Sequence, residues 1–90
     1  KLGVNIDHIA LLRESRKIHD PNPLFALSVC EIAGADQITI HLREDERHIN
    51  LLDAKSIISQ SPLPINLECS LGMIDVACKL KPKRVTIVPE

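Results

Sequence analysis

Charged and imidazole side chains follow an apolar run in the stretch Ile38-Thr39-Ile40-His41-Leu42-Arg43-Glu44-Asp45. Histidine exchanges protons near neutral pH, so His41 could act as a general acid or base. Arg43, with Arg16 from an earlier basic loop, could bind a phosphate or polyol through paired hydrogen bonds. In parallel α/β enzymes, such groups lie at the carboxyl ends of the strands. The alternative for this stretch is a strand that runs into a solvated loop. The alternative for Arg16 is an ordinary surface charge.

Polar side chains also end two other predicted strands. Asn5, Asp7 and His8 follow the first strand, and Glu68 ends the third. A Glu in a partly apolar barrel mouth would have its pKa raised by desolvation and could then share proton transfer with His41. The structural alternatives are a helix-capping role for Asp7, an ion pair for Glu68 and an interior position for the histidine.

A metal site is a weaker alternative. His41, His48 and Glu68 could bind a metal, but neither HxH nor HExxH spacing supports this. The three cysteines are odd in number and lack CxxC spacing, which argues against a zinc site and a disulfide framework. We expect Cys30 and Cys78 to be small core residues of a protein in a reducing compartment, the cytoplasm.

The composition is that of one small globular domain. The 90 residues are 44% hydrophobic and 26% charged, with Phe25 as the single aromatic residue and a net charge of −1. Neither a basic surface nor aromatic stacking is available for nucleic acid, and no apolar run approaches the ~20 residues of a membrane span. The chain lacks an initiator Met and stops after a predicted strand, so we expect a piece of a longer protein.

Apolar periodicity predicts alternating strands and helices. Asn22 and Ser70 are expected to cap helices, and Gly34 is expected to end one. A broad apolar stripe is expected on the first helix. The long connection 8–22 is of a kind that is usually functional or mobile. The strands are expected at residues 2–7, 37–43, 65–68 and 84–88, and the helices at 23–33, 50–59 and 70–80.

The βαβαβαβ order indicates a parallel sheet, and the strand faces favour a barrel over an open doubly wound sheet. Each strand has one apolar face and one polar face, as expected if a ring of helices covers only the outside. A (β/α)₈ barrel needs eight strands and ~250 residues, so residues 1–90 are predicted to be the N-terminal half of one barrel domain. The predicted apolar pairs are Val4/Ile6, Ile38/Ile40, Ile65/Leu67 and Val85/Ile87.

These motifs together resemble the pyridoxine 5′-phosphate synthase family of vitamin B6 biosynthesis. The resemblance rests on Gly3-Val4-Asn5-Ile6-Asp7-His8-Ile9 and on the stretch from Ile38 to Asp45, supported by Asn66-Leu67-Glu68 and Val88-Pro89-Glu90. It implies a TIM barrel assembled as a homo-octamer. It also implies condensation of 3-amino-2-oxopropyl phosphate with 1-deoxy-D-xylulose 5-phosphate, by acid/base catalysis without metal or organic cofactor, and with no nucleic-acid or membrane partner.

The resemblance also implies residue roles. His41 and Glu68 match the family's acid/base groups, and Asn5 matches a contact to the amino-ketone phosphate. The residues that match groups around the deoxyxylulose phosphate are Asp7, His8, Arg16, Arg43 and His48. Lys17 departs from the Gly that many members carry, which puts the phosphate-loop geometry in doubt.

The second half of the barrel carries the family's third catalytic group, a His, and its Gly-rich phosphate loops. Residues 1–90 alone are therefore not expected to catalyse the reaction. Two rival interpretations remain. One is another phosphate-handling barrel enzyme, such as an epimerase or aldolase, although no strand end offers the Schiff-base Lys of an aldolase. The other is a non-catalytic half-barrel module that pairs through its open sheet edges.

Overall fold

The computed structural model describes residues 2–10 and 22–89, which form an α/β unit with a parallel sheet. The predicted alternation of strands and helices is confirmed, and a helical turn at residues 7–10 follows the first strand. The elements are β1 (Gly3–Asn5), α2 (Phe25–Ile32), β2 (Gln37–Leu42), α3 (Leu51–Gln60), β3 (Ile65–Cys69), the 3₁₀ turn η1 (Leu71–Met73), α4 (Ile74–Leu80) and β4 (Arg84–Ile87).

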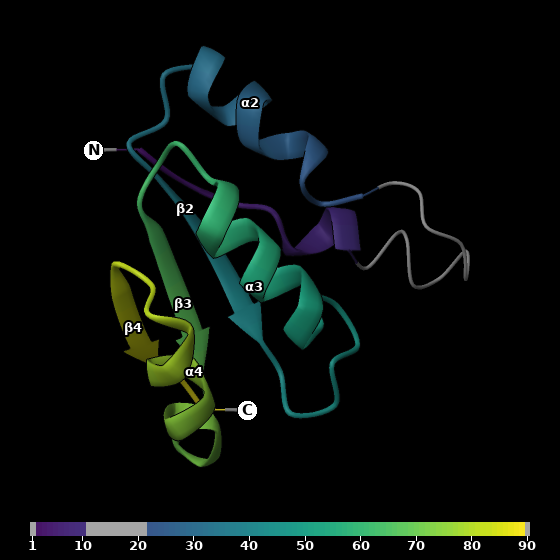
Figure 1. Ribbon diagram of the computed structural model, residues 1–90, viewed down its shortest axis with the longest axis vertical. Helices are drawn as coiled ribbons and strands as arrows, with labels where there is room; N and C mark the ends of the chain where they lie inside the picture. Colours follow the sequence, from purple (N-terminus) through teal and green to yellow (C-terminus); the bar gives the residue numbers. More distant parts are fainter. Residues whose placement is uncertain (1, 11–21, 90) are drawn as a thin grey trace.

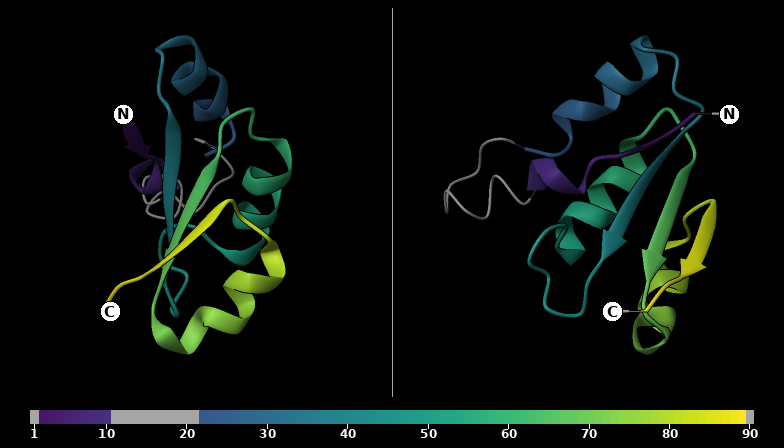
Figure 2. Two further views of the ribbon diagram at one scale, coloured as in Figure 1. Left: turned by 90° about the vertical axis from the view of Figure 1, so that its left-hand side faces the viewer. Right: turned by 180° about the vertical axis from the view of Figure 1, so that it is seen from behind.

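The four strands lie in the order β1-β2-β3-β4, and every neighbouring pair is parallel. Right-handed crossovers that always step in the same direction place their helices on one side of the sheet. The helices α2, α3 and α4 indeed lie on one side, and the view from behind looks onto the uncovered strands (Figures 1 and 2). This arrangement is consistent with part of a (β/α)₈ barrel and differs from a doubly wound sheet, which has helices on both faces.

Alternating burial along the central strands confirms the predicted faces. Ile38, Ile40 and Leu42 of β2 are completely buried, and so is Leu67 of β3. The side chains between them are half-buried. The buried set continues into the helices through small and aliphatic residues, so the core is aliphatic as predicted. Its members in α2, α3 and α4 are Ala26, Leu27, Cys30, Ala54, Ile57 and Ala77.

Local features fix the start of α3 and the end of α2, and the helix end at Gly34 was predicted. Asn50 precedes α3, where its side chain accepts a hydrogen bond from Asp53 N while Asp53 accepts one from Asn50 N. This reciprocal capping box satisfies two backbone donors at the start of the helix. Gly34 follows α2 with a φ of +86°, the left-handed conformation expected of a glycine that ends a helix.

Three predicted boundaries were wrong. Strand β1 ends at Asn5 because the Asn5 side chain accepts a hydrogen bond from Asp7 N, which starts the helical turn. Asn22 accepts a hydrogen bond from Leu24 N, but α2 begins at Phe25. Ser70 makes no capping bond, and a 3₁₀ turn precedes α4.

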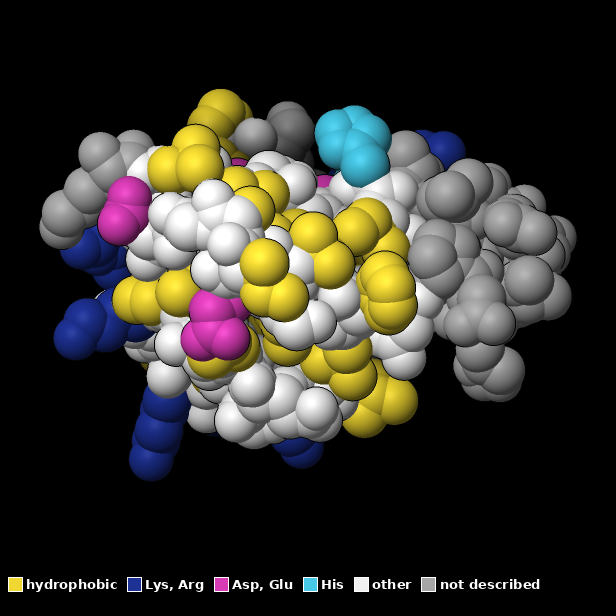
Figure 3. Space-filling view, turned by 90° about the horizontal axis from the view of Figure 1, so that it is seen from above, with side chains coloured by type: hydrophobic (Ala, Val, Ile, Leu, Met, Phe, Trp, Pro, Cys, Tyr) yellow, Lys and Arg dark blue, Asp and Glu magenta, His cyan; other side chains and the backbone are white. Residues whose placement is uncertain are grey.

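The broad apolar stripe predicted for α2 is split between a buried side and an exposed side. Phe25, Val29 and Ile32 are exposed, the last to 85%. They repeat at a helical spacing, so they form one apolar strip on the outer side of α2. Hydrophobic side chains gather on the end of the molecule where α2 lies (Figure 3). Cys78 of α4 is also exposed, in contrast to its predicted core position.

None of the helices in the described ranges is both long and apolar enough to pass through a membrane.

Candidate active site

The polar side of β2 and β3 places an imidazole and a carboxylate next to each other. His41 and Glu68 are directly paired residues in the parallel ladder. Adjacent strands lie about 4.8 Å apart, so the two side chains leave neighbouring backbone positions. Both are half-buried, between buried residues that face the helices. The period of a strand therefore directs both side chains to the uncovered face, as predicted.

Asp7 connects this pair to the end of β1. Its Oδ1 accepts a hydrogen bond of 2.8 Å from His41 N, and its Oδ2 accepts one of 3.0 Å from Asn5 Nδ2. The residue is buried, with only 7% of its surface exposed. A buried carboxylate that accepts several hydrogen bonds fixes the groups that donate them. Asp7 thus holds the backbone of His41 and orients the Asn5 amide.

A second polar layer lies one step nearer the start of the strands. Thr39 pairs with Asn5 on one side and with Asn66 on the other. Asn66 Oδ1 accepts a hydrogen bond of 2.8 Å from Thr86 Oγ1 across β3 and β4. The polar face therefore extends across all four strands.

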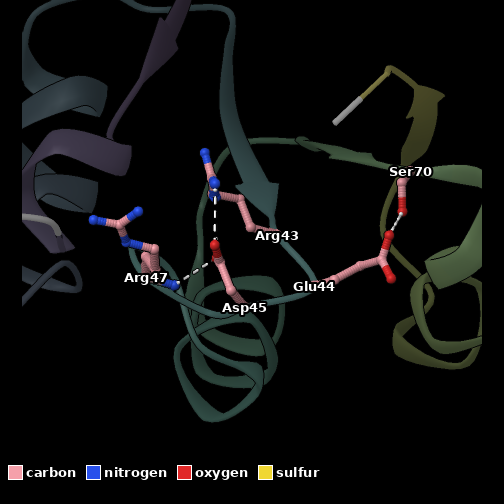
Figure 4. A network of polar contacts seen from close by, with 5 residues as sticks. All are labelled: Arg43, Glu44, Asp45, Arg47 and Ser70. Atoms are coloured by element: carbon pink, nitrogen blue, oxygen red, sulfur yellow. Dashed lines mark hydrogen bonds and ion pairs between the residues drawn. The ribbon is translucent and has the colours of Figure 1, made fainter.

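Arg43, a predicted phosphate ligand, is held by a carboxylate in its own loop. Its Nε and Nη2 donate to Asp45 Oδ1 and Oδ2, both at 3.0 Å (Figure 4). Arg47 N also donates to Asp45 Oδ1, at 3.2 Å. The hydrogen bond from Arg43 lowers the pKa of Asp45 below its usual value, and the backbone bond from Arg47 acts in the same direction.

The acidic residues after β2 organise their loop, and Asp45 is one of three such carboxylates. Glu46, at a φ of 52°, accepts a hydrogen bond of 2.6 Å from Leu51 N. Glu44 accepts one of 2.9 Å from Ser70 Oγ (Figure 4). In the sequence these residues form an ordinary solvated charge run. The Ser70 contact has no signal in the sequence because its partners lie 26 residues apart.

Two further predicted site residues, His8 and His48, lie on the segments that follow β1 and β2. His8 is exposed on the turn after β1, and His48 is half-buried in the loop before α3. Arg16 lies outside the described residues. The structure thus brings together Asn5, Asp7, His41 and Glu68. Within residues 2–10 and 22–89, no group of three or more His, Cys, Asp or Glu side chains could hold a metal ion.

Comparison with known proteins gives one family. The family model described as pyridoxal phosphate biosynthesis protein PdxJ matches residues 2–90. Proteins named pyridoxine 5′-phosphate synthase from Aliarcobacter butzleri and Sulfurovum sp. are 70% and 66% identical over 99% of the chain. One from Nitratiruptor sp. is 65% identical over the whole chain. The chain spans about a third, 35%, of the length of these relatives. This chain belongs to the PdxJ family of pyridoxal phosphate biosynthesis proteins.

Proposed function

We propose that the complete protein containing these residues is a pyridoxine 5′-phosphate synthase. It would condense 3-amino-2-oxopropyl phosphate with 1-deoxy-D-xylulose 5-phosphate to give pyridoxine 5′-phosphate, inorganic phosphate and water. The observation that carries the proposal is the direct pairing of His41 with Glu68 on the uncovered polar face. Membership of the PdxJ family and the names of the relatives support it.

The proposed chemistry needs protons moved at neighbouring atoms. Attack of the substrate amine on the ketone gives a Schiff base and expels water. Elimination of one phosphate as inorganic phosphate, a further dehydration and aromatisation then complete the ring, and each of these steps moves protons. His41 and Glu68 leave adjacent strands at the same level, so one bound intermediate could reach both. Asp7 would keep His41 in place through the backbone hydrogen bond. In this proposal the reaction uses neither a metal nor an organic cofactor.

Further residues are proposed to bind the two substrates. Asn5 would contact the amino-ketone phosphate, and its amide is already oriented by Asp7. Arg43 would exchange its Asp45 partner for a substrate phosphate, because a carboxylate and a phosphate each present two acceptor oxygens to a guanidinium group. The other proposed contacts to the deoxyxylulose phosphate are Asp7, His8, Arg16 and His48.

We further propose that residues 1–90 are the N-terminal half of one (β/α)₈ barrel. Helices on a single side, strands in sequential order and unpaired outer edges at β1 and β4 support this proposal. The length of the relatives leaves room for the other strands. The three free cysteines suit a reducing cytoplasm. By the same resemblance, the complete protein would be a homo-oligomer.

The test is an assay of the full-length protein with both substrates, in which pyridoxine 5′-phosphate and inorganic phosphate are quantified together. We expect equal amounts of the two products, and we expect His41→Asn to lower their rate at least 100-fold. Lys55→Ala, an exposed helix substitution far from the polar face, serves as the matched control. Failure of the parent protein to form any product would overturn the proposed function.

A further inference from the structure

One hydrogen bond joins the loops that follow β2 and β3. Ser70 Oγ donates to Glu44 Oε2 at 2.9 Å, and Figure 4 shows the two side chains reaching toward each other from separate loops. Glu44 comes three residues after His41, and Ser70 comes two residues after Glu68. The bond therefore lies just beyond the proposed acid/base pair, and it connects the segments that carry the two groups.

This contact begins where the backbone pairing stops. The β2–β3 ladder ends at Leu42 and Cys69, which are its last paired residues. Beyond that point the two chains diverge into the loop before α3 and the turn η1. The Glu44–Ser70 bond thus continues the connection between the strands after their main-chain pairing has ended.

Burial makes the contact more than a surface hydrogen bond. Ser70 is only 6% exposed, and it and Asp7 are the buried polar or charged residues of the described chain. A buried hydroxyl without an acceptor is costly, and a carboxylate is the stronger type of acceptor. The Glu44 carboxylate also lies against the backbone of η1, since a Cβ on Gly72 would be 3.6 Å from its oxygens.

We propose that Glu44 is a positioning residue, which holds the Glu68 end of β3 at a fixed distance from His41 through its hydrogen bond to buried Ser70. This inference rests on the proposed function, because it assigns Glu44 to the same reaction. Glu44 acts through Ser70 and touches no reacting atom. The distance between the two strand ends affects the rate because proton transfer depends steeply on the placement of the donor and acceptor.

The test is a double-mutant cycle in the full-length protein, with kcat and KM measured for both substrates. We expect Glu44→Ala to lower kcat about tenfold with KM nearly unchanged, because it both removes the bond and leaves the Ser70 hydroxyl without an acceptor. Ser70→Ala should lower kcat only about threefold, since Glu44 is exposed and can be solvated. Glu44→Gln, which keeps an acceptor oxygen, should restore most of the rate.

The sign of the coupling gives the sharpest result. The double variant Glu44→Ala/Ser70→Ala should be faster than Glu44→Ala alone, because the buried hydroxyl that lacks an acceptor is gone. Glu46→Ala is the control: the Glu46 carboxylate is in the same loop but accepts its hydrogen bond from Leu51 N, so its loss should lower stability without coupling to Ser70→Ala. Independent, multiplying effects of Glu44→Ala and Ser70→Ala on kcat would overturn the proposal.

The same cycle in thermal unfolding separates this inference from the proposed function. If the parent protein made no product, the proposed function and with it the positioning role would fall. The midpoints would still report whether the Glu44–Ser70 bond forms. If the parent is active and the two residues are coupled in stability but not in kcat, the bond is structural only, and the positioning role alone is overturned.

Discussion

The two faces of the sheet differ in what their side chains do. Along β2 and β3, the residues that face the helices are apolar and buried, whereas those on the uncovered face are polar and half-buried. Both sets come from the same strands at a period of two residues. One face therefore supplies stability and the other is free to carry chemistry, and a substitution should affect one property according to its face.

The two faces meet at the carboxyl edge of the sheet. There Asp7 is buried, yet it holds the backbone of His41 from the polar side. The loop beyond β2 is held by carboxylate hydrogen bonds in addition to the apolar packing of buried Ile49. Carboxylate hydrogen bonds are thus added to the apolar packing next to the proposed site.

The largest loss of stability is expected on the helix-facing side. Ile40 is completely buried in the centre of β2, so Ile40→Ala should lower the free energy of unfolding of the full-length protein by about 3 kcal/mol. Thr39→Ala, one residue earlier and on the other face, should cost less than about 1 kcal/mol. Urea denaturation measures both, and equal losses would contradict the division between the faces.

The next effect tests the edge where the faces meet. Asp7→Ala removes the acceptor of His41 N and Asn5 Nδ2, so it should lower the free energy of unfolding by about 2 kcal/mol. The amide of His41 should then exchange its hydrogen faster in deuterated solvent, because its bond is lost. Unchanged exchange at this amide would show that Asp7 does not hold the strand end.

A smaller effect is expected at the start of α3, away from both faces. Asn50→Ala breaks the capping box and should lower the free energy of unfolding by about 1 kcal/mol, as measured by thermal or urea unfolding. Lys55→Ala, on the exposed surface of the same helix, should change stability by less than about 0.5 kcal/mol and is the matched control. A loss of stability in Asn50→Ala no larger than that in Lys55→Ala would show that the capping box does not stabilise α3.

The smallest effect concerns the Arg43–Asp45 pair. Because Arg43 lowers the pKa of Asp45 below 3.8, the pair stabilises the protein above that pH, and this contribution is lost as the pH falls through the lowered pKa. The two side chains are partly exposed, so the contribution is small. Titration by NMR should show the pKa of Asp45 rising toward 3.8 in Arg43→Gln. An unchanged pKa would mean that the pair does not form in solution.

The regular parts of this fold are readable from the sequence. The alternation of Ile38, Ile40 and Leu42 with polar residues identifies both faces of β2, because strand geometry allows only two directions. The pairing of His41 with Glu68 follows from strands of similar length that run parallel from the same edge. Gly34 marks a helix end for a similarly local reason.

The features that the sequence did not predict depend on contacts between residues that lie far apart in the chain. Which apolar residues of α2 are buried depends on how the helix lies on the sheet, and Val29 and Ile32 are therefore exposed. Ser70 resembles a cap locally but bonds to Glu44 from another loop. Neither the buried side of α2 nor the partner of Ser70 can be predicted from residue spacing alone, because both depend on how the elements pack together.

The most direct test of the central claim is a kinetic cycle on His41 and Glu68 in the full-length protein. His41→Asn and Glu68→Gln should each lower kcat for pyridoxine 5′-phosphate formation at least 100-fold. If the two groups act together on one intermediate, the double variant should be only a few times slower than either single variant. Losses that multiply to their full product, or a single variant with the parent's rate, would contradict a joint acid/base role.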